Sequence, residues 1–369
     1  MMKLNLIKHI KTVAFAAVFA GAALLAPSCT NAIYDDEGDC AVTYRIKFRY
    51  DRNLKWADAF ASEVHSVRLY AFDNNGNLVA EYADRGDHLA DPDYSMLLDL
   101  PAGEYHFVAW CGLDNPQAKV QNFVVPQTSL RSTTLDDLTC RLNRYTDQYK
   151  AHSNDWLEFM FHGQLDAVLP ENLDGGDYLY VMPLTKDTNH IRIILQHLNG
   201  EDLDVSKFGF TIEDDNGFYA NDNSLLDDDM ITYTPYSTSS AVAGIIKEDG
   251  SSATGSRAVE TCKTAIADFS VARMMSSHTD RMRLNITYFD NQTGETRKIA
   301  SVPVIDYALL ARDYYEMYYG HPMADNQEFL DREDEYLLTF FIDENYYWYN
   351  AVIYINSWRI VLHDVDLGA

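Results

Sequence analysis

The chain has 369 residues, of which 47% are hydrophobic and 13% aromatic, and its formal net charge is −27. Such a polyanion repels phosphate backbones and anionic bilayers, so nucleic acid is excluded as a predicted partner and flat binding to a membrane surface is disfavoured. The length suits two domains of roughly 100–200 residues each. The 25 Tyr residues favour β-sheets, because aromatic side chains fit a pleated, half-buried surface.

The first residues have the pattern of a secretory signal peptide. Three lysines precede an apolar run over residues 13–25, which is too short for a membrane span, since a spanning helix needs about 20 residues. The run ends in Ala26-Pro27-Ser28-Cys29, and small residues before a Cys resemble a bacterial lipobox. We predict that residues 1–28 are a signal peptide and that Cys29 carries the lipid. The alternative is an ordinary cleavage site, with Cys29 as a plain thiol or half of a disulfide.

Residues 29–40 form the predicted lipidated tether. Their acidic cluster Asp35-Asp36-Glu37 resembles the signal that sends lipoproteins of Bacteroides-like bacteria to the outer face, although a merely solvated tether would have the same composition. No later stretch reaches 18 apolar residues, so no transmembrane helix is predicted. The predicted location is the outer membrane, with the body held by its N-terminal lipid and exposed at the surface.

The remaining cysteines predict at most a small disulfide framework. With Cys29 acylated, four Cys are left, and four Cys allow three complete pairings. Cys40, Cys111 and Cys140 fall in the first half, which favours one disulfide among these three over a bridge to Cys262. No CxxC or paired Cys/His spacing is present, so no structural metal site is predicted.

Strand patterns begin directly after the tether. Val42–Tyr50 alternates apolar and polar residues with a period of two, which predicts a strand with one buried face. A short helical piece is expected over Leu54–Ala61. Val64–Phe72 alternates again and runs into Asp73-Asn74-Asn75-Gly76, a hairpin signal because Asn and Gly tolerate positive φ. Tyr105–Trp110 is a strongly apolar strand.

The second half repeats this strand–turn–strand pattern. Strands are expected over His190–Leu198, Phe208–Ile212 and Leu284–Phe289, and the last strands over residues 337–342, 348–355 and 358–362. Many short strands with regular turns predict an all-β fold of two tandem β-sandwich domains, over residues 41–184 and 185–369. Ser237–Ser256 is rich in Ser, Gly and Ala and is expected to be an exposed loop.

The sequence contains no catalytic signature of weight. It lacks GxSxG, GxxxxGK[ST] and HExxH, so we predict a protein that is not an enzyme and needs no cofactor or small-molecule substrate. Asp73–Asn77 and Asp214–Gly217 could be calcium loops, but they lack the distal Glu and are better explained as turns. Tyr346–Tyr349 is either a strand covered on both faces or a platform on which sugars stack.

Several segments, taken in order and spacing, resemble the FimB-like anchor lipoproteins of Bacteroidales type V fimbriae. The resemblance covers nearly the whole chain after the signal peptide. It is carried by these segments: Ile33-Tyr34-Asp35-Asp36 after Cys29, Asp39-Cys40, Phe48-Arg49-Tyr50-Asp51, Trp56–Phe60, Val67–Asp73 with Gly76, Leu100–Tyr105 with Phe107–Trp110, Phe161-His162-Gly163 and Ile355–Val361.

This resemblance implies two transthyretin-like β-sandwiches in tandem and a subunit at the base of a fimbria. It also implies partners, namely fimbrial stalk subunits joined by strand addition, in which one chain completes the sheet of its neighbour. Because an anchor must keep its amino-terminal segment to keep its lipid, we expect Val42–Tyr50 to stay in place and to limit fibre growth. The alternatives are a surface glycan-binding lipoprotein and a minor stalk or tip subunit.

Overall fold

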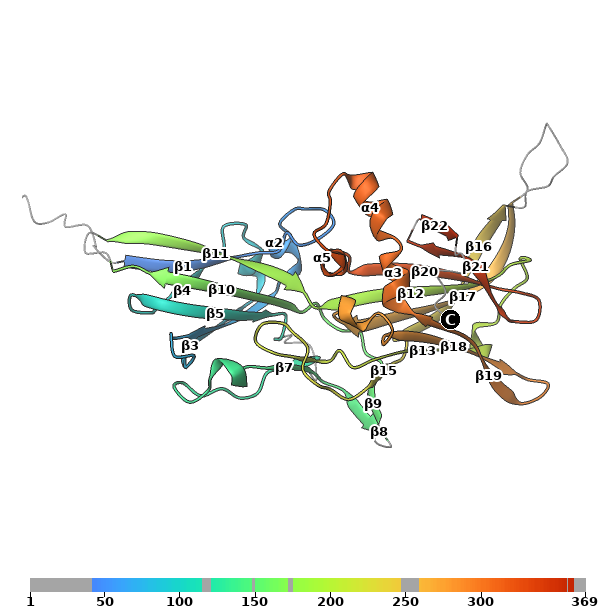
Figure 1. Cartoon of the computed structure of the whole chain (residues 1–369), viewed down its shortest axis with the longest axis horizontal. Helices are drawn as coiled ribbons and strands as arrows, with labels where there is room; N and C mark the ends of the chain where they lie inside the picture. Colours follow the sequence, from blue (N-terminus) through green and yellow to red (C-terminus); the bar gives the residue numbers. More distant parts are fainter. Residues whose placement is uncertain are drawn as a thin grey trace, which may run out of the picture. The chain divides into compact units, whose positions relative to one another are not determined.

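β-strands make up about half of the described chain and form four sheets (Figure 1). The computed structural model of the protein describes residues 42–114, 121–147, 150–171, 175–246, 259–356 and 358–361. The predicted all-β fold is confirmed. Cys29, Cys40 and the proposed signal peptide lie outside the described residues.

The first sheet has seven strands in the order β3-β2-β5-β10-β11-β1-β4. β1 is an interior strand of this sheet, and its side chains Tyr44, Ile46 and Phe48 are 0–5% exposed, so the predicted buried face is confirmed. The strands are β1 (Val42–Arg49), β2 (Ser66–Phe72), β3 (Leu78–Arg85), β4 (Met96–Leu98), β5 (Gly103–Cys111), β10 (Phe161–Leu169) and β11 (Gly176–Lys186).

Two six-stranded sheets follow, in the orders β16-β17-β12-β20-β21-β22 and β19-β18-β13-β15-β9-β8. Their buried apolar side chains, such as Ile193 of β12 and Leu284 of β18, belong to one hydrophobic cluster. The strands are β8 (Tyr145–Asp147), β9 (Lys150–Ser153), β12 (Thr188–His197), β13 (Phe208–Asp214), β15 (Ile231–Tyr233), β16 (Ser237–Ile246), β17 (Val259–Ala272), β18 (Arg283–Asp290), β19 (Glu295–Pro303), β20 (Glu335–Ile342), β21 (Trp348–Ile355) and β22 (Trp358–Val361).

A small three-stranded sheet contains β14 (Phe218–Tyr219), β7 (Cys140–Leu142) and β6 (Phe123–Val124). In this sheet β14 pairs with β7, and in the neighbouring six-stranded sheet β15 pairs in parallel with β9. In both places a strand from the first half of the sequence pairs with a strand from the second half. By their contacts, the described residues of 44–171 and 178–361 group together as one compact unit. The division into domains 41–184 and 185–369 stays a prediction.

The expected exposed loop over Ser237–Ser256 is wrong in its first part. Ser237–Ile246 is strand β16, which pairs antiparallel with β17 from Ser237↔Asp268 to Ile246↔Val259. Its residues Ser237–Val242 are exposed on both faces, so a backbone ladder rather than side-chain burial holds the strand. The rest of the expected loop lies outside the described residues.

The helices differ most from the sequence expectation. The piece expected over Leu54–Ala61 is helical only in α2 (Phe60–Glu63), because Asp58 Oδ1 accepts the Phe60 N–H at 3.0 Å and the helix begins there. Three more helices, which were not predicted, connect β19 to β20: α3 (Val304–Leu309), α4 (Arg312–Tyr319) and α5 (Asn326–Arg332). Within the described part of the chain, no helix combines the length and hydrophobicity that a membrane span requires.

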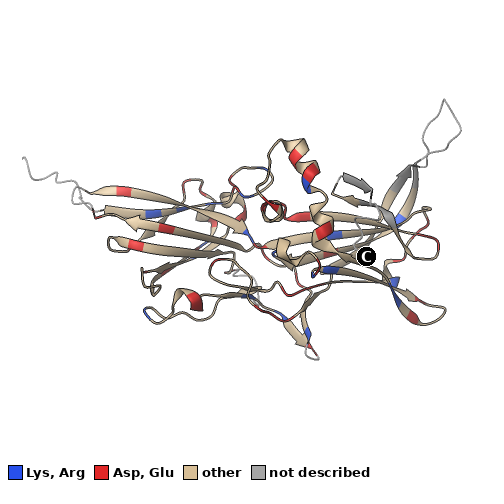
Figure 2. Cartoon of the chain, in the orientation of Figure 1, with Lys and Arg blue, Asp and Glu red and all other residues tan. Residues whose placement is uncertain are grey.

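Short 3-10 turns complete the fold. They are η1 (Asp87–Ala90), η2 (Leu135–Asp137), η3 (Val205–Lys207) and η4 (Ser276–His278). Acidic and basic side chains are spread over all sheets of the described chain rather than gathered at one place (Figure 2).

Candidate functional site

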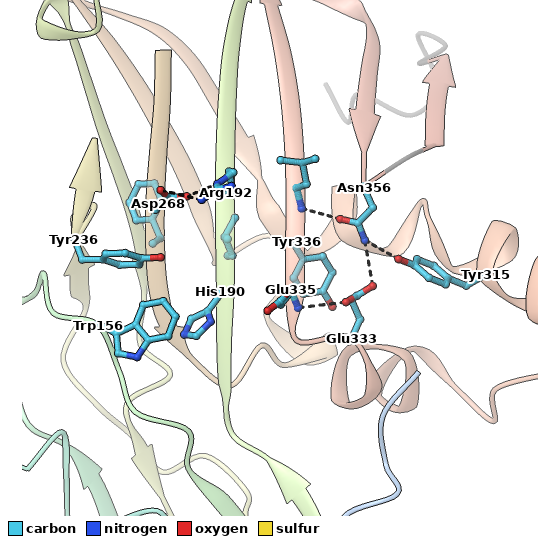
Figure 3. Close-up of a pocket in the computed structure, with 13 residues that line it drawn as sticks. Trp156, His190, Arg192, Tyr236, Asp268, Tyr315, Glu333, Glu335, Tyr336 and Asn356 are labelled. Atoms are coloured by element: carbon cyan, nitrogen blue, oxygen red, sulfur yellow. Dashed lines mark hydrogen bonds and ion pairs between the residues drawn. The ribbon is translucent and has the colours of Figure 1, made fainter. Parts of the chain in front are cut away.

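A groove of about 550 Å³ lies on the face of the β12–β20 sheet that is turned away from the hydrophobic cluster (Figure 3). The register pairs His190 with Glu335 and Arg192 with Asp268, so strand alternation directs these four side chains to the same face. The lining residues are Trp156, His190, Ile191, Arg192, Tyr236, Asp268, Phe269, Tyr315, Glu333, Glu335, Tyr336, Leu337 and Asn356.

We call this groove the Trp156 groove. One of its ends is lined by aromatic side chains. The Trp156 and His190 ring centroids are 3.9 Å apart, and Tyr236 meets the indole nearly perpendicularly at 5.1 Å. Trp156 as a whole residue is 44% exposed despite these contacts. Burial lowers the pKa of His190, so the imidazole under the indole is held in its neutral form. Trp156 was not singled out by the sequence analysis.

Polar groups converge beside the rings. Arg192 Nε donates to Asp268 Oδ1 at 2.6 Å, and the Arg192 side chain is more than half exposed while Asp268 is nearly buried. Glu335 is exposed and stands next to His190 in the neighbouring strand. Guanidinium and carboxylate groups in one open groove can together donate to and accept from a hydroxylated ligand.

The other end of the Trp156 groove is a closed polar network. Asn356 Nδ2 donates to the Tyr315 hydroxyl at 2.7 Å and to Glu333 Oε2 at 3.1 Å, and its Oδ1 accepts the Leu337 N–H at 2.7 Å. Burial raises the pKa of Glu333 to about 7. This network fixes α4 and the start of β20 against the turn after β21, and it leaves Asn356 without spare donors.

A second cluster of charged side chains is buried where β11 leads into β12. Arg273 donates to both oxygens of Asp331 at 2.8 and 2.9 Å and to the Asn223 carbonyl at 3.0 Å. Its Nε also lies 3.6 Å from Asp187, which is completely buried and accepts from Asn223 Nδ2 at 2.9 Å. Burial raises the pKa of Asp187 to about 7. These four residues are the junction cluster.

Lys186 reinforces the same region. Its ammonium group pairs with Glu63 at 3.0 Å and with Asp334, and it lies 3.3 Å from the centre of the Phe159 ring. The side chain is only 2% exposed. This geometry is that of a buried structural ion pair, because every donor direction is met by a carboxylate or an aromatic face.

The predicted turns hold their carboxylates internally. Asp73 Oδ1 accepts the N–H groups of Asn75 and Asn77 at 2.9 Å, which lowers the pKa of Asp73 and closes an Asx turn. At the second turn, Asp214, Asp215 and His278 place ligand atoms within 4.8 Å of one another. His278 Nδ1 bonds Asp214 Oδ1 at 2.9 Å and Arg281 pairs with Asp215, so each of these carboxyl groups has a partner within the protein.

The thiols Cys111, Cys140 and Cys262 are buried and free. The structure therefore forms no disulfide between Cys111 and Cys140. A bridge that involves Cys40 stays a prediction, as does lipidation of Cys29, because neither residue belongs to the described part. Burial raises the pKa of both Cys111 and Cys140, which keeps them as unreactive thiols near neutral pH.

The aromatic run Tyr346–Tyr349 is divided between packing and solvent. The Tyr346 ring stacks on Tyr288 at 4.3 Å, and Trp348 packs near Phe340 at 6.1 Å, as expected for residues that face the interior. Tyr347 and Tyr349 are 59% and 41% exposed. The run thus supplies packing on one face and single exposed rings on the other.

Sequence comparison identifies the family. The family model of fimbrillin-A associated anchor proteins Mfa1 and Mfa2 matches residues 36–364. The chain belongs to this family. The predicted resemblance to fimbrial anchor proteins is thereby confirmed, and no curated protein matches the chain.

Solved structures show the same fold as this fimbrial anchor family member. A candidate adhesin from Bacteroides thetaiotaomicron is 32% identical, with a TM-score of 0.70 over 88% of this chain and 98% of that chain. A second protein of that organism, described as a candidate polysaccharide-binding protein, is 27% identical, with a TM-score of 0.70 over 88% and 99%. The fimbrial anchor protein Mfa2 from Porphyromonas gingivalis is 18% identical, with a TM-score of 0.59 over 88% and 100%.

Proposed function

We propose that this protein is the base subunit of a fimbria, holds the fimbria on the outer membrane through a lipid on Cys29, and limits its growth. The match to the anchor family over residues 36–364 carries the proposal. The signal-peptide pattern that ends at Cys29 supports it, since a lipid on that residue supplies the membrane hold. Stable retention requires more than one acyl chain, because a single chain binds only marginally.

The position of β1 supports the growth-limiting role. β1 lies between β11 and β4, and Phe48 stacks on Phe60 at a centroid distance of 5.8 Å, while Tyr50 meets Phe161 at 4.9 Å. The segment that follows the lipid tether thus completes the first sheet from within its own chain. A sheet completed in this way has no place at β1 for a strand from a neighbour, so the fibre would extend from another edge.

Among the edges of the described sheets, β16 is the one best suited to accept a strand. It has ten residues and no charged side chain. The other edge strands are protected: β3 and β19 carry several charged residues, and β4, β6, β8, β14 and β22 are four residues or shorter. Long, flat, uncharged edges pair readily with another chain, because backbone N–H and C=O groups are left open. We therefore propose β16 as the edge at which a fimbrial subunit adds its strand.

Ser240→Lys should weaken this docking. A charge on the exposed β16 edge disfavours strand addition, so the amount of fimbrial subunit that co-purifies with the chain should fall by about tenfold, a loss of about 1.4 kcal/mol. Thr296→Lys, on the exposed edge of β19, is the matched control and should leave co-purification unchanged. Equal recovery with both variants would show that β16 is not the docking edge.

Loss of the protein should release fimbriae from the cell. Cells that lack the chain should still polymerise fimbrial subunits but shed the fibres into the medium, and those fibres should be longer than normal because the growth-limiting subunit is missing. A Cys29→Ala chain should restore normal length and leave the fibres unattached, since its folded body is intact. Immunoblots of medium and membranes, with electron microscopy of fibre length, provide the measurement. A normal number of attached fibres without this chain would refute the anchoring role.

A further inference from the structure

The indole of Trp156 is large, apolar and open, yet it is held rigidly. Next to it, the Leu157 N–H donates to Ser270 Oγ at 3.1 Å, which fixes the backbone against β17. His190 lies under the ring and Tyr236 borders it, so the indole has a defined orientation (Figure 3). Core packing explains a buried aromatic residue, but it leaves unexplained a fixed one that is 44% exposed.

The polar side chains of the Trp156 groove are also held in place. Arg192 and Asp268 orient each other through two contacts, at 2.6 and 3.4 Å, and Arg192 remains more than half exposed. An Arg that gives two N–H groups to one carboxylate retains further donors in the same plane. Glu335 adds an exposed acceptor in the adjacent strand. Hydrogen-bond donors and acceptors thus already stand beside the aromatic rings, so the protein need not rearrange to bind a ligand there.

We propose that the Trp156 groove binds a neutral saccharide. One face of a pyranose ring carries C–H groups that pack on an aromatic ring, while the hydroxyls on its edge donate to carboxylates and accept from guanidinium groups. The groove offers both kinds of partner. Its volume of about 550 Å³ falls within the roughly 300–1,000 Å³ of small-ligand sites. This binding activity is separate from anchoring and does not depend on it.

The charges of the groove select among saccharides. In its lining the one cation, Arg192, is already paired with Asp268, and Glu335 adds an exposed carboxylate. The chain as a whole also carries a net charge of −27. Uronic and sialic acids would therefore meet repulsion both at long range and inside the groove, whereas uncharged hexoses and pentoses would not.

Affinity electrophoresis of the full chain, solubilised in detergent, tests the proposal with α-mannan, dextran, arabinogalactan and xylan as neutral probes and polygalacturonate as the acidic one. At least one neutral polysaccharide should retard the protein, and polygalacturonate should not. Trp156→Ala should weaken that interaction about tenfold, through loss of the stacking surface. Trp156→Phe keeps an aromatic face and should retain most of the affinity.

Two further variants separate binding in the groove from misfolding and from binding by exposed rings elsewhere on the surface. Glu335→Ala removes an exposed acceptor, so the protein should fold normally and bind more weakly. Tyr347→Ala removes an aromatic residue outside the groove that is even more exposed than Trp156, and this variant should bind as the wild type does. The proposal is overturned if no neutral probe retards the wild type, if polygalacturonate is preferred, or if Trp156→Ala and Glu335→Ala bind as well as Tyr347→Ala.

Discussion

Arg273→Ala is expected to lower the free energy of unfolding by about 3–5 kcal/mol, the range for breaking a buried ion pair by removal of one partner. Arg273 is 8% exposed, and its guanidinium compensates two carboxylates at once. In its absence Asp331 keeps a hydrogen bond from Gln327 at 2.9 Å, whereas Asp187 keeps only that from Asn223 and has one oxygen without a partner. Because the Arg273 charge lowers the pKa of Asp187, its removal makes this buried carboxyl take up a proton at pH 7, and that protonation, together with the lost contacts of Arg273, causes the loss of stability.

Urea unfolding at pH 7, followed by tryptophan fluorescence, measures this change. Arg281→Ala is the matched control, because it removes an Arg–Asp pair of 3.1 Å in which the Arg side chain is 59% exposed, and exposed pairs contribute about 0–1 kcal/mol. Adding Asp187→Asn to Arg273→Ala should recover part of the lost stability. If Arg273→Ala costs no more than Arg281→Ala, the junction cluster does not stabilise the fold.

Much of the sheet structure could be predicted because its signals are local. The alternation of Tyr44, Ile46 and Phe48 marks β1 without reference to the rest of the chain. The turn after β2 was predicted from Asn75-Gly76, and Gly76 has φ of 74°, which glycine adopts without strain. Periodicity and turn chemistry each depend on a few neighbouring residues, so a sequence is enough to identify them.

Strand β16 and the helices could not be identified by the same signals. Ser237–Val242 of β16 have no buried face to produce alternation, and the strand is held mainly by its backbone pairing with β17. Helix α4 contains four Tyr residues, which favour strands, although Gly320 at φ of 71° and Asp325, which accepts the Glu328 N–H at 2.8 Å, mark the end of α4 and the start of α5. Those two signals were available in the sequence and were missed.

The Trp156 groove was out of reach for a different reason. Its functional side chains come from five separate segments, and Trp156 and Glu335 are 179 positions apart (335 − 156), yet both border His190. The register of β12 with β17 and β20 places His190 beside Glu335, and the hydrogen bond of Leu157 to Ser270 of β17 holds the segment of Trp156 there. A local signal exists for Trp156 alone, a single large aromatic residue within the polar segment Ser153–Glu158, and it indicates exposure rather than a ligand.

Glu333 should make the stability of the protein depend on pH in a specific direction. Burial raises the pKa of Glu333 from 4.5 to about 7. Between these values the folded protein keeps a proton on Glu333 that the unfolded chain has lost. The contribution of this group to the free energy of unfolding is therefore complete below pH 4.5. It declines as the pH rises and is gone above about pH 7. The full difference is about 3 kcal/mol, at 1.36 kcal/mol for each pKa unit.

Glu333→Gln isolates this effect, because glutamine can still accept from Asn356 Nδ2 but carries no charge. The variant should match the wild type near pH 4.5 and exceed its free energy of unfolding by about 3 kcal/mol at pH 7.5. His162 has the opposite effect on stability, because burial lowers its pKa to about 4 and the free energy of unfolding falls as the pH drops below about 6.5. This effect is the same in both proteins, so it cancels when the variant is compared with the wild type. Urea titrations of both proteins at five pH values measure the difference. A constant difference between pH 4.5 and 7.5 would show that Glu333 is not protonated in the folded protein.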